Sequence, residues 1–343
     1  MKQIPILKGR FAIDVDWLLS MCRSSPSDLV LVSGTLIEGI GNAGSDLDVY
    51  VIADNLPRRG RFANSSFYTE ILDGDGHLIL ENDEDGQVHA LYFYHPTIGI
   101  HVDVKFLTQE KLDAIFSEIR SASDSLLNDD NIFYTTAPLS FGYDDSQIIH
   151  RILHSVCVSG SSEFASLKDS IPLMEYHCAV YGDLALDHPA LLDLKGFLSA
   201  SESILALEVA RSLLFRNTHA LLVALGATNR NPKWISKYLH LLPESLAERF
   251  IDVLTADSRT EENRLSYIRN AVQYIEESHF ITLATESSAR VFGELQRLAP
   301  FLKSGLSRRQ AQHQMSIDAY NIRAWSFGFG SQSAISEFIG RQS

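Results

Sequence analysis

Three short segments in the first third of the chain have the side-chain pattern of β-strands. Residues 29–32 form a continuous apolar run, which predicts a buried strand that Gly34 and Thr35 end at a tight turn. After a ten-residue connection, the β-branched segment 47–52 predicts a second strand. Residues 100–106 alternate strictly between apolar and polar side chains and predict a third. Alternation sends apolar side chains to one face of each strand and polar ones to the other.

Other segments predict helices and a further antiparallel region. Residues 14–23 carry apolar side chains at helical spacing, and strands are expected over residues 67–72, 77–81 and 87–94. The turn at residues 73–76 resembles the start of a calcium loop but lacks the terminal glutamate, so we expect a solvated hairpin turn. Thr108 precedes an apolar stripe over residues 112–119, which predicts a capped helix. A connection over residues 129–145 then leads into a helical pattern.

Acidic side chains stand at the start of the second predicted strand. Asp46 and Asp48 project to the same face, about 7 Å apart, because each strand residue rises roughly 3.3 Å. Two carboxylates so close repel each other unless a cation lies between them, and Mg²⁺ prefers such hard oxygen ligands. Asp103 lies on the polar face of the third strand. If that strand neighbours the second, three carboxylates converge, as a two-metal phosphoryl displacement requires.

The turn before these carboxylates has the residues of a phosphate-binding segment. In Ser33-Gly34-Thr35 the bare Gly34 lets backbone N–H groups approach a phosphate, and Thr35 adds a hydroxyl. Residues 39–44 read G-x-G-x-x-G, the string of a dinucleotide-binding turn. That turn must follow a strand and open a helix, whereas this segment leads into an acidic strand. We therefore expect a pliant loop at the mouth of the site.

Together these residues resemble the nucleotidyltransferases of the DNA polymerase β superfamily. The mark of that superfamily is Gly-Ser, a spacer, Asp-x-Asp or Asp-x-Glu, and a later Asp on a neighbouring strand. The chain has Gly34-Thr35, a ten-residue spacer, Asp46-Leu47-Asp48 and Asp103, with Thr35 in place of the usual Ser. The spacer is similar to that of the aminoglycoside nucleotidyltransferases. Residues 220–235 resemble, more weakly, the helical domain of the small-molecule enzymes.

The resemblance implies an α+β fold with two domains. A catalytic domain over residues 1–125 would hold a mixed β-sheet flanked by helices. An all-helical C-terminal domain over residues 126–343 would follow it. Lys233, on the second domain, would then reach the triphosphate as a flexible point charge.

The implied activity is Mg²⁺-dependent transfer of a nucleoside monophosphate, AMP from ATP or that of another nucleoside triphosphate. The acceptor would be a hydroxyl, expected on a small molecule, and pyrophosphate would be released. Asp46, Asp48 and Asp103 would be both the catalytic and the metal-binding residues. The nucleotide would be bound by the following residues: Ser33, Gly34, Thr35, Ser45 and Lys233.

Two alternative functions stay open within the resemblance. The chain could synthesise oligo- or cyclic nucleotides or modify a protein. It could also be a catalytically silent antitoxin or binding partner of the same fold. A zinc site at His150 and His154 is not favoured, because no third ligand is evident, and a partly exposed helix face is expected there.

Charge, cysteine content and the length of apolar runs limit the binding partners and the cellular compartment that can be expected. The net charge of −14 argues against bulk nucleic acid, whose phosphates require clustered Lys and Arg. The odd set Cys22, Cys157 and Cys178, without metal-type spacing, fits a reducing compartment. With no signal-peptide pattern and no apolar run of membrane length, a cytoplasmic protein is expected. Hydrophobic stripes on the C-terminal helices predict either a domain core or a homodimer interface.

Overall fold

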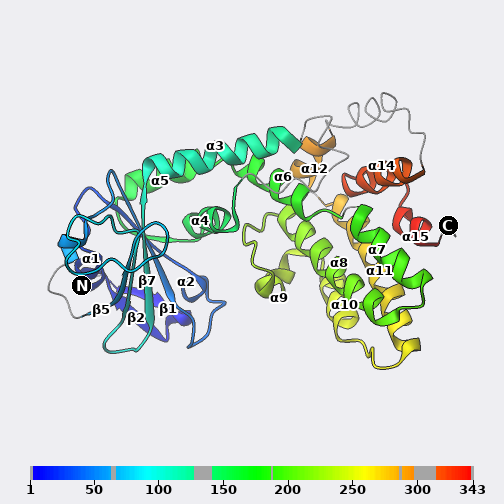
Figure 1. Ribbon diagram of the computed structural model, residues 1–343, viewed down its shortest axis with the longest axis horizontal. Coiled ribbons are helices and arrows are strands. Elements are labelled where there is room, and N and C mark those ends of the chain that lie inside the picture. The colour runs from blue at the N-terminus through cyan, green and yellow to red at the C-terminus, as the bar shows by residue number, and fades with distance from the viewer. Residues whose placement is uncertain are drawn as a thin grey trace. The chain divides into compact units, whose positions relative to one another are not determined.

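A computed structural model describes residues 3–62, 67–126, 141–186, 188–285, 288–296 and 314–340 of the chain. By packing, the chain divides into two units. The sheet unit comprises Met1–Ser117 and Asp144–Ile171, and the helical unit comprises Glu118–Tyr143 and Pro172–Ser343 (Figure 1). The predicted domain boundary after residue 125 stays a prediction, because packing units and independently folding domains need not coincide. Most of the predicted connection over residues 129–145 lies outside the described residues.

The sheet unit is built on a six-stranded mixed sheet of order β5-β6-β7-β4-β3-β8. The central pair β4 and β7 is parallel, and the other neighbouring pairs are antiparallel. A separate hairpin, β1 and β2, precedes it. The strands are β1 (Gln3–Ile6), β2 (Phe11–Asp14), β3 (Leu29–Ser33), β4 (Leu47–Ala53), β5 (Tyr68–Leu72), β6 (Ala90–Tyr94), β7 (His101–Thr108) and β8 (Val156–Ser159).

The alternation predicted for the central strands separates a core face from a polar face. On β4 and β7 the side chains of Leu47, Val49, Val102 and Val104 are completely buried in one apolar cluster. The same cluster includes residues of α1 (Val15–Cys22) and α2 (Thr35–Glu38). The intervening residues, including the three aspartates, therefore lie on the opposite face.

Side-chain caps mark the start of two helices, α1 and α3. The Asp14 carboxylate accepts a hydrogen bond of 2.9 Å from the Trp17 N–H at the start of α1, as expected for a helix over residues 14–23. The Thr108 hydroxyl accepts one of 3.2 Å from the Lys111 N–H at the start of α3 (Gln109–Leu126). Two further helices, α4 (Tyr143–Leu153) and α5 (Ser161–Ser170), frame β8 in sequence.

Two elements differ from the expectation. Residues 77–81 form no strand. Within the described residues, their β-type pairing is limited to an isolated bridge between Leu78 and Leu72. The Asp73 side chain accepts hydrogen bonds from the Asp75 and His77 N–H groups, which closes the predicted turn, and the acidic run that follows is a poor strand former. Conversely, β8 lies in a span predicted to be all helical. It pairs with β3 and extends the sheet there.

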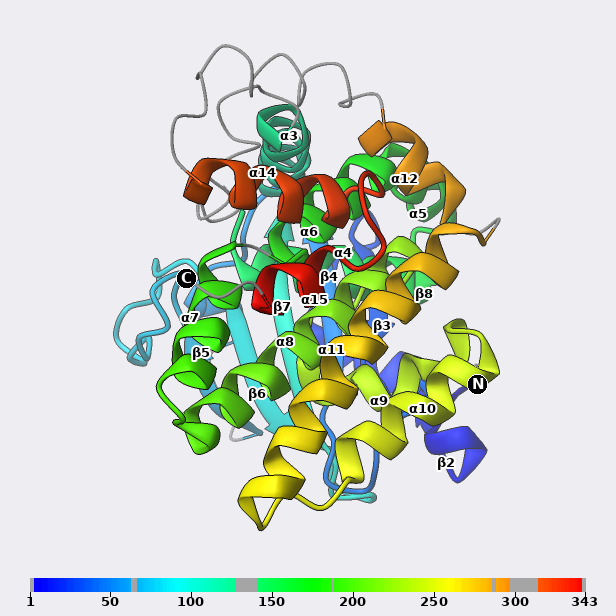
Figure 2. The same ribbon diagram turned by 90° about the vertical axis from the view of Figure 1, so that its right-hand side faces the viewer.

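Packing of two long, parallel helices forms the core of the helical unit, with Ser203 contacting Arg264 near the two helix starts and Asn217 contacting Ser278 further along. Helices α8 and α11 lie side by side in both ribbon views (Figures 1 and 2). Their apolar residues share one cluster with α7, α10 and the C-terminal helices. The helices of the unit are α6 (Leu173–Leu184), α7 (His188–Ser199), α8 (Ser203–Ala224), α9 (Ile235–Tyr238), α10 (Glu244–Thr255), α11 (Glu261–Leu283), α12 (Ala289–Gln296), α14 (Gln314–Ser326) and α15 (Ala334–Gly340). The α+β fold class is thus confirmed.

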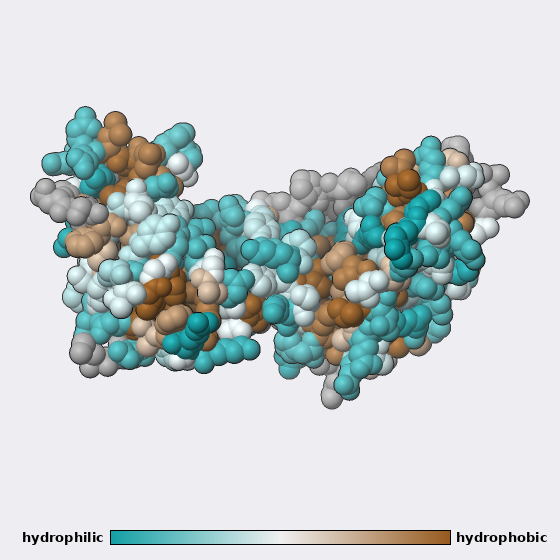
Figure 3. All heavy atoms as spheres, turned by 90° about the horizontal axis from the view of Figure 1, so that it is seen from below, coloured by the Kyte–Doolittle hydropathy of each residue, from teal (hydrophilic) through white to brown (hydrophobic). Residues whose placement is uncertain are grey.

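The surface bears on the predicted partners. Hydrophobic residues gather in separate patches among hydrophilic ones on the face shown in Figure 3. In the helical unit Ile204, Leu205 and Phe280 are exposed. The predicted homodimer stays a prediction. Within the described part of the chain, no helix combines the length and the apolar character needed to cross a membrane.

The Thr108 cap can be tested by substitution. Thr108→Ala removes the hydroxyl that accepts the Lys111 N–H, so we expect the free energy of unfolding to fall by about 1 kcal/mol. Thr97→Ala, at an exposed loop position, should change it by less than about 0.5 kcal/mol. Urea unfolding followed by circular dichroism compares the two variants. Equal effects would contradict the capping role.

Candidate metal and phosphate site

Strand pairing brings the predicted carboxylates together. In the parallel pair of β4 and β7, Asp48 stands directly opposite Asp103. In the antiparallel pair of β3 and β4, Ser33 stands opposite Asp48. The second and third predicted strands, β4 and β7, are therefore neighbours, as the resemblance implied. Asp46 immediately precedes β4 on the same face.

Asp46 and Asp103 share their end of the sheet with a histidine. Ligand atoms of Asp46, His101 and Asp103 all lie within 4.8 Å of one another. The His101 Nδ1 atom is 2.9 Å from Asp103 Oδ1 and 3.7 Å from Asp46 Oδ1. Two carboxylates and an imidazole fit a divalent cation, because these side chains supply anionic oxygens and one neutral nitrogen. His101 was placed on this face by the sequence, but without a role.

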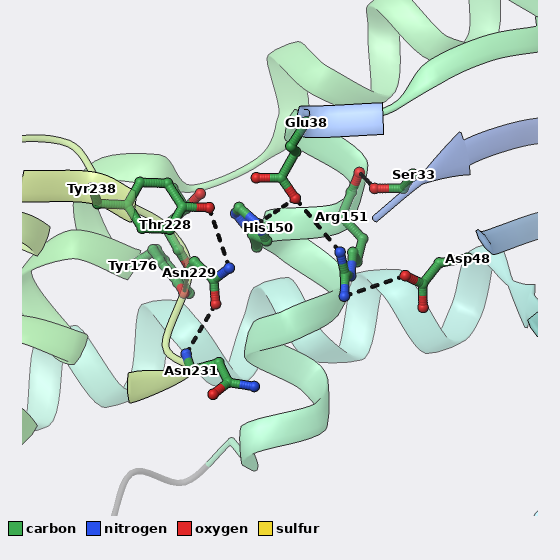
Figure 4. Close-up of polar contacts among 10 residues, drawn as sticks. All are labelled: Ser33, Glu38, Asp48, His150, Arg151, Tyr176, Thr228, Asn229, Asn231 and Tyr238. Carbon is green, nitrogen blue, oxygen red and sulfur yellow. Dashed lines mark hydrogen bonds and ion pairs between the residues drawn. The ribbon is translucent and has the colours of Figure 1, made fainter. Parts of the chain in front are cut away.

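Asp48 faces an arginine instead of the histidine. Arg151, near the end of α4, places Nη2 3.3 Å from Asp48 Oδ2 and Nη1 3.5 Å from Glu38 Oε1 (Figure 4). The Arg151 backbone is held as well, because the Ser33 hydroxyl donates a hydrogen bond of 2.8 Å to its carbonyl oxygen. Arg151 was not among the residues predicted for the site. The only local signal is an arginine within the apolar pattern of a helix.

Glu38 connects this arginine to a buried histidine. His150 Nε2 lies 3.2 Å from Glu38 Oε1, and the His150 side chain is completely buried (Figure 4). The expectation of a partly exposed helix face was wrong for His150. The neighbouring side chains of Ile149 and Ile152 are completely buried, so His150 lies on the buried face of α4. His154 is exposed, but it follows the end of α4 and so lies on no helix face. The glutamate contact gives His150 a structural role in this unit.

Burial and mutual repulsion raise the pKa of two of the carboxylates. Burial is the main cause of the raised Asp48 pKa, which the charges of Arg151 and Lys105 partly offset. Burial also raises the Asp103 pKa, to about 6; His101 opposes the rise, while Asp46 and Asp48 add to it. The three carboxylates therefore act on one another electrostatically. A divalent cation would relieve the cost of ionising them together.

The segment after β3 passes unusually close to Asp48. Gly34 has φ of +97°, and a Cβ atom there would overlap the Asp48 carboxylate and lie 3.4 Å from Arg151 Nη1. Ser33 and Thr35 on either side are buried. Only glycine accommodates this conformation next to Asp48, so Gly34 shapes the site rather than merely ending a strand.

Hydrogen bonds order the loop that precedes β4. The Ser45 hydroxyl accepts one of 3.0 Å from the Asn42 N–H, and the Asn42 side chain accepts one of 2.9 Å from the Gly44 N–H. Gly41 approaches Thr35 so closely that a Cβ atom would lie 2.7 Å from the Thr35 hydroxyl. The Ser45 and Thr35 hydroxyls thus both lie close to Gly41, and both nucleotide-binding roles stay predictions.

Lys233 belongs to the helical unit. It lies in the short 3₁₀ helix Pro232–Trp234, where the Asn231 carboxamide accepts a hydrogen bond of 3.1 Å from its N–H. Its ammonium lies 5.0 Å from the centre of the Trp234 ring. Within the same unit, the Asn229 carboxamide bonds to the Tyr238 hydroxyl and the Asn231 N–H (Figure 4). The predicted contact of Lys233 with triphosphate stays a prediction.

No protein-family model matches the sequence, and no curated protein matches it. Among solved structures, the chain is similar to a nucleotidyltransferase-like protein from Exiguobacterium sibiricum, with 10% sequence identity and a TM-score of 0.39. The similarity covers 86% of this chain and 90% of the other. The function proposed below therefore rests on the residues of the site.

Gly34 provides a test of the packing against Asp48. Gly34→Ala should lower the free energy of unfolding by at least about 3 kcal/mol, because the new methyl group overlaps the carboxylate and the φ angle disfavours side chains. In an Asp48→Ala background the same change should cost only about 1–3 kcal/mol. Gly44→Ala, in the same segment with ordinary contacts, serves as the control. Denaturant unfolding of all variants measures the difference; equal costs in both backgrounds would refute the overlap.

The raised Asp103 pKa predicts a pH-dependent gain in stability on neutralisation. The folded chain takes up this proton at about pH 6 and the unfolded chain near pH 4, so ionised Asp103 destabilises the metal-free fold above that range. Asp103→Asn should raise the free energy of unfolding by about 1–2 kcal/mol at pH 7.5, a value reduced for the partly exposed side chain. The gain should shrink as pH falls from about 7 to 4. A pH series of urea unfolding checks this, with Asp54→Asn as control; a pH-independent difference would contradict it.

Proposed function

We propose that the protein is a divalent-metal-dependent nucleotidyltransferase. It would move a nucleoside monophosphate, AMP from ATP, to a hydroxyl group of a small acceptor and release pyrophosphate. One observation carries the proposal: parallel pairing of β4 and β7 sets Asp48 opposite Asp103, with Asp46 on the same face. Mg²⁺ is the expected cation, and Asp46, Asp48 and Asp103 are its proposed ligands.

The carboxylates would divide the metal-binding and acid–base roles. Asp46 and Asp103, whose carboxylates both lie near the His101 ring, would hold one side of the metal site. Asp48 would hold the other side. When bound, Mg²⁺ would neutralise the carboxylates and supply positive charge for the phosphate oxygens. An Asp103 carboxylate oxygen would accept the proton of the acceptor hydroxyl and so act as the general base.

The reaction balances without any further reactant. The acceptor oxygen forms a bond to the α-phosphorus, and the bond from that phosphorus to the bridging oxygen breaks. The electron pair of the broken bond leaves with pyrophosphate. The Gly34 and Thr35 backbone would bind the leaving phosphates, because the missing side chain at Gly34 lets them approach the turn.

The first experiment is calorimetric titration of ATP, GTP, CTP and UTP into the protein with and without Mg²⁺. We expect binding of a triphosphate that requires the metal. Asp48→Asn keeps the shape of the side chain but removes a ligand charge, so it should weaken this binding and reduce pyrophosphate release on the order of 10²-fold or more. A panel of small hydroxyl compounds then serves to find the acceptor by pyrophosphate release.

Asp54→Asn is the matched control, because Asp54 is exposed and follows the opposite end of β4. It loses the same charge and should bind and react like the wild-type protein. Absence of triphosphate binding in the presence of Mg²⁺ would reject the proposed function and favour a silent binding partner. Equal turnover of Asp48→Asn and the wild-type protein would reject the metal assignment.

A further inference from the structure

The guanidinium of Arg151 is incompletely paired within the chain. Its guanidinium contacts two carboxylates, but at 3.3 Å from Asp48 and 3.5 Å from Glu38 both contacts are long (Figure 4). Charge-assisted hydrogen bonds of this kind are normally about 2.7–2.9 Å. The buried Nη1 atom makes no hydrogen bond to any residue that the structure describes. An unsatisfied donor of a charged group is costly to bury, so a ligand that supplies an acceptor at this point would remove the cost.

The acceptor that fits is a phosphate. Nη1 lies over Gly34, where an added Cβ atom would be only 3.4 Å away, so the arginine and the bare turn adjoin the same space. The planar guanidinium matches the paired oxygens of a phosphate group. The Ser33 hydroxyl holds the backbone of Arg151, which leaves the side chain free to change partner.

We propose that Arg151 binds the triphosphate of the incoming nucleotide and leaves Asp48 when it does so. The inference rests on the proposed function. Without ligands, the positive charge of Arg151 compensates the buried Asp48 carboxylate. With Mg²⁺ and nucleotide bound together, Asp48 would hold the metal, which would supply the compensating charge, and the Arg151 guanidinium would bind the phosphate oxygens. Arg151 therefore competes with the metal for Asp48 but cooperates with it in binding nucleotide.

This exchange predicts opposite effects of one substitution on two ligands. Arg151→Gln removes the charge that competes for Asp48, so the protein should bind Mn²⁺ alone about three- to tenfold more tightly. The same variant should bind ATP with Mg²⁺ at least about tenfold more weakly, because it lacks the phosphate ligand. A residue that only supports the fold would weaken both. Electron paramagnetic resonance of free Mn²⁺ and calorimetry of ATP measure the two affinities.

Two further variants keep the test decisive. Arg58→Gln removes an arginine from an exposed ion pair with Asp85 and should leave both affinities unchanged. Arg151→Lys keeps the positive charge but loses the planar fork, so it should restore the wild-type Mn²⁺ affinity while ATP stays weaker. This lysine variant tests the proposal even if Arg151→Gln folds poorly, and thermal unfolding of each variant establishes whether it folds.

The outcomes separate the two proposals. If the wild-type protein binds no triphosphate, the proposed function fails, and the role of Arg151 fails with it. If wild-type and Arg151→Gln proteins bind ATP equally, the nucleotide site stands but Arg151 is not a phosphate ligand. Weaker binding of both Mn²⁺ and ATP by Arg151→Gln would also overturn the exchange. Tighter Mn²⁺ with weaker ATP would support it.

Discussion

Parallel pairing of β4 with β7 is the constraint on which the rest of the site depends. It sets Asp48 opposite Asp103, and the two-residue period of the strands then places Asp46 and His101 on the same face. The opposite side chains of both strands, such as Val49 and Val104, are completely buried in the core. A shift of register by one residue would exchange these faces and bury the carboxylates, so the core fixes the site as firmly as it fixes the fold.

A site built this way carries an electrostatic cost that the surrounding residues only partly offset. Burial raises the pKa of both Asp48 and Asp103, and nearby carboxylates raise it further. Arg151 and Lys105 oppose the effect at Asp48. Stability alone would favour neutral residues here, so the arrangement is understandable as one that a cation completes.

The sequence predicted those features that depend on neighbouring residues along the chain. Alternation identified the central strands and the face of each aspartate, and Thr108 marked the start of α3. It could not show that β4 and β7 adjoin, since about fifty residues separate them; there the resemblance supplied the expectation. Arg151 was missed for a similar reason, because its partner Asp48 lies on a distant strand and the four-residue β8 that follows α4 has too little pattern to predict a sheet edge. Residues 77–81 show the converse: side chains suited to a strand did not form one, since the Asp73 turn and the acidic run after it removed the pairing.

Charge explains why metal and nucleotide should bind together. The chain has a net charge of −14, and the site adds carboxylates at the point where a triphosphate would lie. The negative charge of the protein therefore attracts a cation and repels a free nucleoside triphosphate, which is an anion. The proposed metal-bound triphosphate would carry less negative charge, and its metal would be bound by Asp46 and Asp103. Arg151 contacts Asp48 beside Gly34, so its positive charge offsets part of the negative charge at this point. In the proposed function the strand-end carboxylates and the α4 arginine would have complementary tasks: the carboxylates would bind the cation, and the arginine would bind phosphate in a protein that is acidic overall.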